Sequence, residues 1–361
     1  MKYSFLICLI FCCFELKSQN KDHSNLFLSA EYAYGAIIPE YQFVNSIVEK
    51  NIQQLEISLL KKTYGTSFWQ RKYNYPQFGF SLFASTLGNK TILGDEFAFF
   101  PFVQFSSHPS KKLHIENKIG LGLGFATKRF DLEENYQNIA VGSIVNVHFN
   151  YRLGFTYDLN ATTSLRAGLN FHHYSNANMK EPNLGINMVS ASLGLTKAIT
   201  PQKTRLSPEI PSFEKGNEFL FIQSFGGKHT RALQSDVYFT SSFAFEFNRK
   251  LNHNFHFGTG LDLFYDASTK IEMSVKDSSN YTKKDDFRTG IHIAQEFVYN
   301  KCSFIIQEGI YVGLVDKVSH SFMYNKIIFR YKWNKHLITQ AAVKSHLHIL
   351  DYPEIGFSYY F

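Results

Sequence analysis

The residues best suited to chemistry lie together between Phe171 and Asn187, in the stretch FHHYSNANMKEPNLGIN. His173 and Ser175 are two residues apart, and alternate side chains of a β-strand share a face. Asn187 falls on the matching face of the next predicted strand, and a hairpin brings such strand ends to within about 4.5–5.5 Å at Cβ. A hydroxyl, an imidazole and an amide so placed are typical of nucleophilic catalysis, with Ser175 attacking, His173 accepting its proton and Asn187 orienting the ring.

The same three residues also have a simpler interpretation. Their strand neighbours on the same faces are apolar. If those faces contact lipid, three polar groups there are costly unless they bond to one another. At the level of lipid headgroups, however, such groups cost little. On the residues alone, ordinary polarity at the rim of a membrane protein is therefore the simpler interpretation.

Period-2 patterns recur along the chain and predict an all-β fold. In VNVHFNYRLGFTYD, residues 145–158, apolar side chains occupy one face and mostly polar side chains the other. About sixteen such segments occur, each roughly 9–14 residues long, which is the span of a tilted membrane strand. The predicted strands lie near residues 26–37, 52–62, 77–86, 96–106, 113–126, 145–158, 163–175, 187–198, 218–226, 236–248, 253–266, 287–299, 302–314, 323–333, 337–349 and 354–361.

The composition and both ends of the chain favour a transmembrane antiparallel β-barrel. Aromatic residues make up 17% of the chain, and no segment after the first twenty residues has about eighteen consecutive apolar residues. The start, MKYSFLICLIFCCFELKSQN, predicts a signal peptide over residues 1–18. The ending Tyr359-Tyr360-Phe361 resembles the assembly signal of outer-membrane barrels, which implies the barrel assembly machinery as a partner during biogenesis. We therefore expect a multi-pass β-barrel in the outer membrane of a Gram-negative bacterium.

Charge and cysteine content narrow the partners. The net charge of +7 suits contact with the anionic headgroups of outer-membrane lipids. No block of Lys and Arg of the kind that marks nucleic-acid binding is present, so no nucleic-acid partner is expected. Only Cys302 lies outside the predicted signal peptide, which leaves no intrachain disulfide. The histidines and carboxylates give no clear metal-ligand spacing, and no metal is expected.

Two organisations fit sixteen strands. A proline-containing segment, residues 200–216, reads as a periplasmic linker between residues 19–199, which carry the candidate site, and residues 217–361, which resemble a degenerate repeat. We expect one barrel of about 16 strands, because sequence neighbours pair readily and a short linker merges into a turn. The alternative is two tandem 8-stranded barrels. Long polar connections near residues 127–143, 176–186 and 268–286 fall on the outer side in either case.

The candidate site resembles a family signature. His173-Tyr174-Ser175-Asn176-Ala177, followed by Asn183-Leu184-Gly185-Ile186-Asn187, is similar to the pattern His-x-Ser-Asn and then Asn-Pro-Gly-x-Glu of the outer-membrane lipid A 3-O-deacylase (acyloxyacyl hydrolase, PagL) family. YNYPQFG, residues 73–79, adds to the likeness, which is best over residues 26–198. The family consists of eight-stranded outer-membrane barrels whose lipid-facing triad hydrolyses an acyl ester of lipopolysaccharide.

The resemblance implies roles for individual residues. Ser175 would be the nucleophile, His173 the general base and Asn176 an oxyanion contributor, with Asn183 and Gly185 supporting the loop. Lipid A would be the substrate, and a serine mechanism of this kind implies no cofactor.

Two positions depart from the family pattern. Leu184 stands where the family has Pro, and Asn187 where it has Glu. An amide oxygen can hold the His173 ring, but it cannot offset the charge of the imidazolium. In a serine protease, the exchange of acid for amide lowers the rate by about 10⁴. The enzyme would then be slow, would borrow a carboxylate for which Glu181 is the nearest candidate, or would carry a vestigial site.

Two rival functions involve no hydrolysis. The first is a catalytically inactive porin or transporter barrel, in which Arg152, Arg166, Arg288 and Arg330 would line an anion-conducting pore. The second is a structural or adhesive barrel. A lumen filled by side chains would disfavour the channel.

A second polar cluster lies in the C-terminal half. His346, His348, Asp351 and Glu354 fall on the inward faces of their predicted strands, as does Asp262. Because polar groups are expected inside such barrels, we interpret this cluster as a network that braces the barrel, in preference to a second active site.

Overall fold

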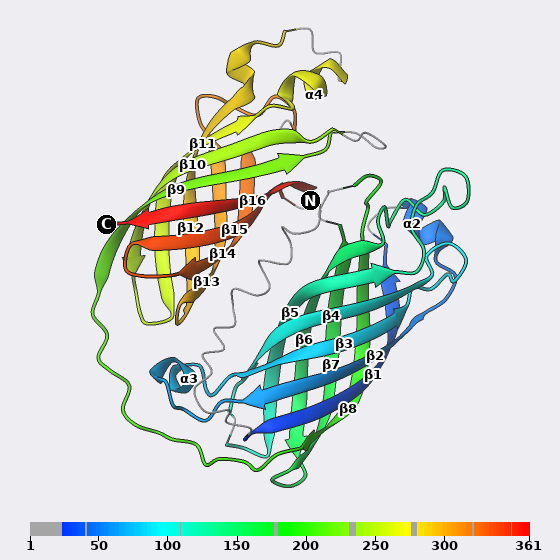
Figure 1. The fold of residues 1–361 in the computed structure, drawn as a ribbon, viewed down its shortest axis with the longest axis vertical. Coiled ribbons are helices and arrows are strands. Elements are labelled where there is room, and N and C mark those ends of the chain that lie inside the picture. The colour runs from blue at the N-terminus through cyan, green and yellow to red at the C-terminus, as the bar shows by residue number, and fades with distance from the viewer. Residues whose placement is uncertain are drawn as a thin grey trace. The chain divides into compact units, whose positions relative to one another are not determined.

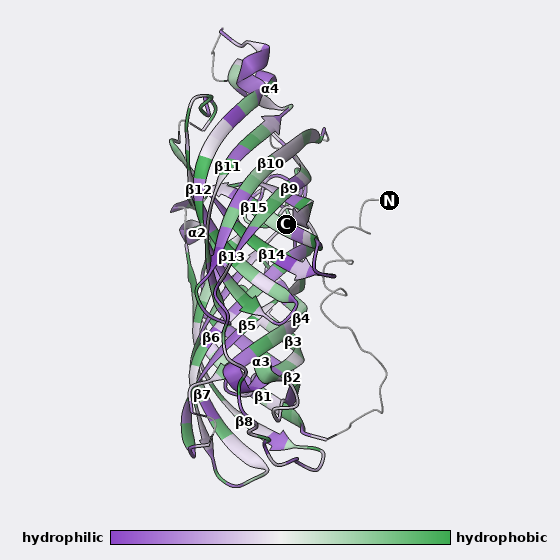
Figure 2. Ribbon diagram, turned by 90° about the vertical axis from the view of Figure 1, so that its left-hand side faces the viewer, coloured by the Kyte–Doolittle hydropathy of each residue, from purple (hydrophilic) through white to green (hydrophobic). Residues whose placement is uncertain are grey.

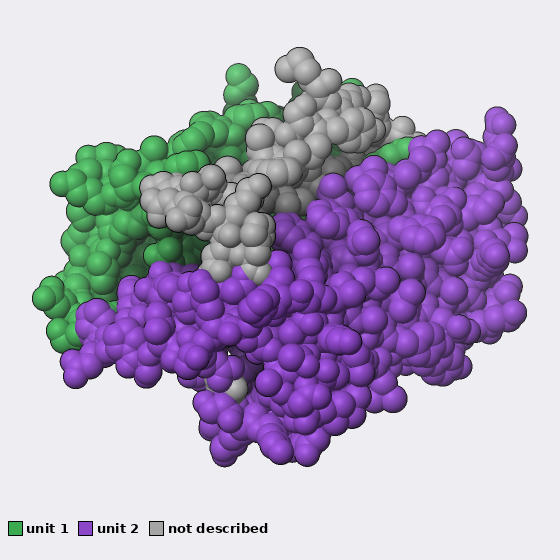
Figure 3. Space-filling view, turned by 60° about the horizontal axis from the view of Figure 1, so that its bottom comes forward, with its two compact units in different colours: residues 1–15, 177–181, 212–361 green, residues 16–176, 182–211 purple. Residues whose placement is uncertain are grey.

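The computed structural model describes most of the chain. The described residues are 24–39, 42–108, 110–176, 180–230, 236–275, 280–319, 321–347 and 349–361. The predicted signal peptide and His348 lie outside these ranges. The chain divides into two compact units, drawn in different colours in Figure 3. Each unit holds one β-barrel and is described by itself.

Sixteen antiparallel strands form the two barrels (Figure 1). The first barrel consists of β1 (Leu26–Ile38), β2 (Ile52–Lys62), β3 (Gln77–Thr86), β4 (Asp95–Ser106), β5 (Leu113–Ala126), β6 (Val145–Asp158), β7 (Thr163–Ser175) and β8 (Ile186–Ala198). The second consists of β9 (Gly216–Lys228), β10 (Tyr238–Lys250), β11 (Phe255–Asp266), β12 (Phe287–Tyr299), β13 (Cys302–Tyr311), β14 (Met323–Lys332), β15 (Leu337–His346) and β16 (Ile349–Tyr360). The all-β expectation is confirmed, and the strands fall close to the predicted segments.

The expected single barrel of about 16 strands is wrong, and the alternative of two tandem 8-stranded barrels is found. β1 pairs with β8 from Phe27 opposite Ala198 to Ile38 opposite Asn187. β9 pairs with β16 in the same way. Residues 199–215 contain no strand, so the linker does not merge into a sheet. Each set of eight therefore satisfies its own edge hydrogen bonds, and no edge remains for the other set to pair with.

Alternation sorts the side chains between the two surfaces of each barrel wall. In β6 the even-numbered residues from Asn146 to Thr156 are buried inside the barrel, and the odd-numbered residues are more exposed outside it. Figure 2 shows the resulting bands of hydrophobic and hydrophilic residues along the strands. Because successive side chains of a strand point to opposite faces, one register fixes both surfaces. The exterior is therefore apolar and the interior mostly polar, as in a barrel that lies in lipid.

We call the end of each barrel at which its last two strands are joined the outer end. The short helix α2 (Gln42–Ile47) lies in the β1–β2 connection at this end, and α3 (Phe68–Lys72) lies in the β2–β3 connection at the opposite end. In the second barrel, α4 (Thr269–Val275) and the 3₁₀ helix η1 (Lys283–Asp286) lie in the β11–β12 connection. None of the described helices has the length and apolar composition to span a membrane.

The outer end of the first barrel is closed by an apolar cluster. α2 contributes Val44 and Ile47 to it. The remaining buried members come from strands and from their outer connections, namely Ile37, Ile52, Leu87, Leu93, Ala126, Ala140, Val141, Tyr174, Ile186 and Met188. Burial of these side chains ties the outer connections to β7 and β8. The ends of β7 and β8 are thus held from the inside.

Candidate active site

β7 and β8 bring the three candidate residues into one line. His173 lies directly opposite Asn187 in the strand register. The Nδ1 atom of His173 is 2.7 Å from Asn187 Oδ1, and its Nε2 atom is 2.8 Å from Ser175 Oγ. With the amide oxygen facing the ring, Nδ1 carries the hydrogen and donates a hydrogen bond to Asn187 Oδ1. Nε2 can then accept the hydroxyl hydrogen of Ser175, which is the geometry of a nucleophile next to its base.

The exterior surface around the triad is apolar. Ser175 lies opposite Val147 and His173 opposite Phe149 on β6. Asn187 lies opposite Ile38 on β1. All three triad residues are half-buried at the outer end of the wall. Ser175 therefore lies on the exterior surface of the wall, among apolar neighbours.

The alternate residues of the same strands anchor the triad from inside. Tyr174, between His173 and Ser175, is 0% exposed and belongs to the apolar cluster. Its hydroxyl accepts a hydrogen bond of 2.9 Å from Asn146 Nδ2. Met188, next to Asn187, is also fully buried in the cluster. Because neighbours on the opposite face are fixed, the triad side chains start from fixed backbone positions.

The loop after Ser175 is closed by short hydrogen bonds. The Asn183 side-chain oxygen accepts a bond of 2.9 Å from the backbone N–H of Asn176. Gly185 has φ +73°, and a Cβ atom there would lie 3.2 Å from His173 Cε1. A left-handed conformation beside the His173 ring explains a glycine at this position. Asn183 and Gly185 are thus placed as supports of the loop.

The local structure explains why Leu184 can stand where the family pattern has Pro. Its backbone N–H donates a hydrogen bond of 3.2 Å to the Ile139 carbonyl, and that of Gly185 donates one of 3.0 Å to the Ala140 carbonyl. Proline has no N–H and could not make the first bond. Leu184 also packs its side chain against the apolar cluster. The β5–β6 connection, residues 127–144, therefore braces the site loop.

Glu181 and Asn176 are placed differently from the other predicted site residues. Both ring nitrogens of His173 already have partners, so Glu181 does not hold the ring in this structure; Asn187 does. The backbone N–H of Asn176 is used by Asn183, and its side chain is 1% exposed. A role of Asn176 as an oxyanion donor stays a prediction that rests on its side-chain amide.

Sequence reasoning missed the residues that support the site from a distance. Ile139 and Ala140 lie in the connection near residues 127–143, which the sequence predicts to be polar. One signal was available, because residues 139–142 read IAVG, and such an apolar run is unusual in an exposed loop. No group of three or more His, Cys, Asp or Glu is arranged to hold a metal ion in the part of the chain that the structure describes.

The interior of the first barrel is filled by ion-paired side chains. Arg152 Nε is 2.9 Å from Glu31 Oε2, and Arg166 Nη1 is 3.0 Å from Glu31 Oε1. Lys118 is paired with Glu56. All five side chains are at least nine-tenths buried. The arginines are thus neutralised by carboxylates rather than lining an open anion path.

The second barrel is filled in the same way. Arg330 forms two hydrogen bonds of 2.8 Å to Glu246, and Asp262 accepts one of 2.6 Å from His292. Lys326 pairs with Glu354 at 2.7 Å. The charges of Arg330 and Lys326 are thus neutralised by carboxylates inside this barrel as well.

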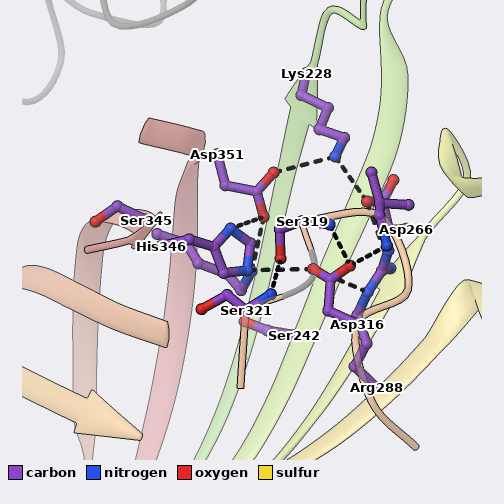
Figure 4. Close-up of polar contacts among 12 residues, drawn as sticks. Lys228, Ser242, Asp266, Arg288, Asp316, Ser319, Ser321, Ser345, His346 and Asp351 are labelled. Atoms are coloured by element: carbon purple, nitrogen blue, oxygen red, sulfur yellow. Dashed lines mark hydrogen bonds and ion pairs between the residues drawn. The ribbon is translucent and has the colours of Figure 1, made fainter. Parts of the chain in front are cut away.

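Figure 4 shows the polar cluster at the outer end of the second barrel. His346 Nε2 lies 3.2 Å from Asp316 Oδ2 and is hydrogen-bonded to the Tyr311 hydroxyl at 2.9 Å. Lys228 bridges Asp266 and Asp351 at 2.9 and 3.1 Å. Within the described ranges no serine hydroxyl bonds to His346, so the expected bracing network is found for the described members and a second triad is not.

Known families match both barrels. The family model of lipid A 3-O-deacylase (PagL) matches residues 53–196, which contain the candidate triad. The model of the acyloxyacyl hydrolase C-terminal domain matches residues 217–361. No curated protein matches the chain.

The solved structures that match this chain include three proteins at low identity. Neisserial surface protein A is 11% identical, covering 48% of this chain and 97% of its own, with a TM-score of 0.34. The outer membrane enzyme PagL is 17% identical, covering 46% and 97%, with a TM-score of 0.33. The Pseudomonas putida toluene transporter TodX is 11% identical, covering 94% and 88%, with a TM-score of 0.19. At these scores the likenesses carry no argument about function.

Proposed function

Because residues 53–196 of this chain belong to the lipid A 3-O-deacylase (PagL) family and residues 217–361 to the acyloxyacyl hydrolase C-terminal domain family, we propose that the protein is an outer-membrane serine esterase. Its substrate is an acyl ester of lipid A, cut at the exterior rim of the first barrel. The observation that carries the proposal is His173, which bonds to Asn187 with one ring nitrogen and to Ser175 with the other. Three polar side chains on an apolar wall that bond to one another in this order suit ester hydrolysis better than rim polarity.

The proposed reaction has two steps. Ser175 Oγ attacks the ester carbonyl while His173 Nε2 takes its proton. The tetrahedral intermediate collapses, the sugar alkoxide leaves with the proton from His173, and the acyl chain remains on Ser175. Water then attacks the acyl-enzyme with His173 again as base, which releases the fatty acid and restores Ser175. Asn187 keeps the ring in the tautomer that both steps need.

The approach of the substrate follows from the surface around Ser175. Phe149 and Phe171 lie edge to face at 6.4 Å beside His173, and Val189 lies next to Phe171 across the β7–β8 pair. These apolar side chains offer contact area for an acyl chain. The substrate therefore arrives sideways through the leaflet, and its ester group reaches Ser175 at headgroup level.

The test compares wild-type protein with Ser175→Ala on lipopolysaccharide in detergent. Mass spectrometry of lipid A is expected to show loss of one acyl chain with the wild type only. Ser241→Ala is the matched control, because Ser241 is an exterior serine of the second barrel that bonds to Gln223 at 2.8 Å. Equal deacylation by wild type and Ser175→Ala, or none by either folded protein, would sink the proposal.

A further inference from the structure

A buried asparagine lies in the β5–β6 connection, which braces the loop of the candidate site. Asn138 is 0% exposed, although it belongs to a connection at the outer end of the barrel. A buried amide is costly unless it is hydrogen-bonded. The nitrogen of Asn138 donates to the Ile92 carbonyl at 2.9 Å, and its oxygen accepts from the Val141 N–H at 3.2 Å. One side chain therefore joins the β5–β6 connection to the β3–β4 connection.

The bond to Val141 closes a turn whose two middle residues hold the site loop. Ile139 and Ala140 lie between the two bonded residues. Their carbonyls accept hydrogen bonds from the N–H groups of Leu184 and Gly185, at 3.2 and 3.0 Å. Two consecutive carbonyls can meet two consecutive N–H groups only if the turn keeps its shape. The position of the site loop therefore depends on the turn that the buried asparagine closes.

The acceptor of Asn138 is itself fixed. The side-chain oxygen of Asn89, which is 4% exposed, accepts hydrogen bonds of 3.0 Å from the N–H groups of Thr91 and Ile92. Its nitrogen donates to the Ile47 carbonyl at the end of α2, at 2.8 Å. Two buried asparagines thus link the β1–β2, β3–β4 and β5–β6 connections. Because each amide bonds to backbone groups of another connection, the site loop rests on a support that is anchored across the barrel mouth.

Gly185 connects this support to the reacting groups. A Cβ atom at Gly185 would lie 3.2 Å from His173 Cε1 and 3.3 Å from Ser175 Cβ, so its backbone packs beside both side chains. Two residues further on, Asn187 holds the His173 ring at 2.7 Å. Proton transfer requires the ring to stay aligned with the serine hydroxyl, and a displacement of about 1 Å can lower a rate about 10²-fold. A shift of the site loop would therefore disturb the base and its holder together.

We propose that Asn138 is a positioning residue for ester hydrolysis at Ser175. The inference rests on the proposed function, because it gives Asn138 a part in that reaction. Asn138 acts through the turn that supports the loop beside His173, and not by contact with the ester. The surface offered to the acyl chain includes Phe149 and Phe171 on the barrel wall, away from this turn. Loss of the Asn138 side chain therefore lowers kcat and leaves KM unchanged.

The test compares full-length wild type and Asn138→Ala in detergent, in two reactions. The first is release of fatty acid from lipopolysaccharide. The second is labelling of Ser175 by a small alkyl fluorophosphonate, followed by mass spectrometry. Labelling reports on the alignment of Ser175 with His173 and requires no bound lipid. Asn138→Ala should lower kcat and the labelling rate by about 10- to 100-fold, with a KM within about twofold of the wild type.

Asn25→Gly is the matched control for a general loss of stability. Asn25 is also buried, and its side-chain oxygen accepts a hydrogen bond of 2.6 Å from the Lys203 N–H, at the opposite end of the same barrel. Its φ is +62°, so glycine can keep the backbone conformation. Asn25→Gly should unfold at a lower urea concentration than the wild type and keep both rates.

Asn138→Asp is a second variant, in case Asn138→Ala does not fold. Its carboxyl can still accept the Val141 N–H, but it donates to the Ile92 carbonyl only when it is protonated. The labelling rate of Asn138→Asp relative to the wild type should therefore rise as the pH is lowered from about 9 to about 5. Equal labelling rates for the two proteins across this range would contradict the inference.

The outcomes separate this inference from the proposed function. Rates of Asn138→Ala equal to those of the wild type would overturn the inference, as would an equally large loss of rate in Asn25→Gly. A wild type that is labelled at Ser175 but leaves lipopolysaccharide intact would overturn the proposed substrate alone, and the labelling rates would still decide the role of Asn138. A wild type that reacts in neither assay would overturn both.

Discussion

Replacing Asn187 by Asp should raise the rate of ester hydrolysis. Asp is isosteric with Asn, so one oxygen can keep its place 2.7 Å from His173 Nδ1. The change adds a negative charge beside the ring that becomes an imidazolium when Ser175 attacks. The charged state forms on the way to the transition state and not in the resting enzyme, so the added attraction lowers the barrier.

The size of the expected rate increase for Asn187→Asp follows from the geometry of the site. Two unit charges about 4 Å apart attract by about 4 kcal/mol at an effective dielectric of 20 and by about 1 kcal/mol in water. The triad is half-buried, so about 1–3 kcal/mol is appropriate. That range corresponds to a rate increase of roughly 5- to 150-fold. It is smaller than the factor of about 10⁴ for the reverse exchange in a serine protease, where the wrong tautomer adds to the loss. Here Asn187 already holds the correct tautomer.

The assay is the initial rate of fatty-acid release from lipid A, with Ser175→Ala as the blank. Asn117→Asp is the matched control, because Asn117 is an exterior asparagine of the same barrel that bonds to Tyr151 at 2.9 Å. It adds the same charge to the same surface away from His173. Asn187→Ala should fall below the wild type, because the ring loses its holder. A folded Asn187→Asp protein that is no faster than wild type would refute the view that the missing charge limits His173.

Three further outcomes test the support of the candidate active site and the polar cluster of the second barrel. Gly185→Ala should lower hydrolysis at least about tenfold in a folded barrel, because a Cβ at φ +73° would press on His173; rates and heat-modified gel mobility measure this. Tyr174→Phe should cost about 1 kcal/mol in urea unfolding, because Asn146 loses its acceptor inside the barrel. Burial would raise the pKa of Asp316, but the hydrogen bond from His346 and the charge of Arg288 hold that pKa well below its usual value. Its stabilising contribution is therefore present above about pH 4 and declines as the pH falls further, which hydrogen exchange of residues 312–319 should show for wild type but not for Asp316→Asn.

The strands could be predicted because each one carries its own signal. β6 begins at Val145 and ends at Asp158 in the structure, as alternation predicts. The number of barrels could not be predicted in this way. Closure after eight strands requires β1 to pair with β8, and the alternation within each strand is the same whether eight or sixteen strands share the wall. Sequence proximity favoured the wrong closure because it says nothing about which distant edges meet.

The placement of the three candidate residues was predictable for the same reason as the strands. Alternation along β7 puts His173 and Ser175 on one face, and the β7–β8 hairpin places Asn187 opposite His173. The residues that support the site loop could not be predicted, because their role depends on contacts between distant segments. The bond from Leu184 to Ile139 joins two loops that are separated by β6 and β7. No local sequence pattern predicts such a pairing. The hydrogen bond can be identified only from a structure that contains both loops.

Polar side chains have different partners on the two surfaces of the barrel wall, and this difference determines which surface can hold an active site. Inside, charges such as Arg152 and Glu31 are buried and already bonded to each other, so a substrate entering there would have to displace ion pairs in a low-dielectric interior. Outside, polar groups are few, and each one stands out against aliphatic neighbours. Ser175 and His173 are hydrogen-bonded to each other, and in the proposed function they remain so until an ester arrives. This arrangement suits turnover, because the resting state is stable without ligand.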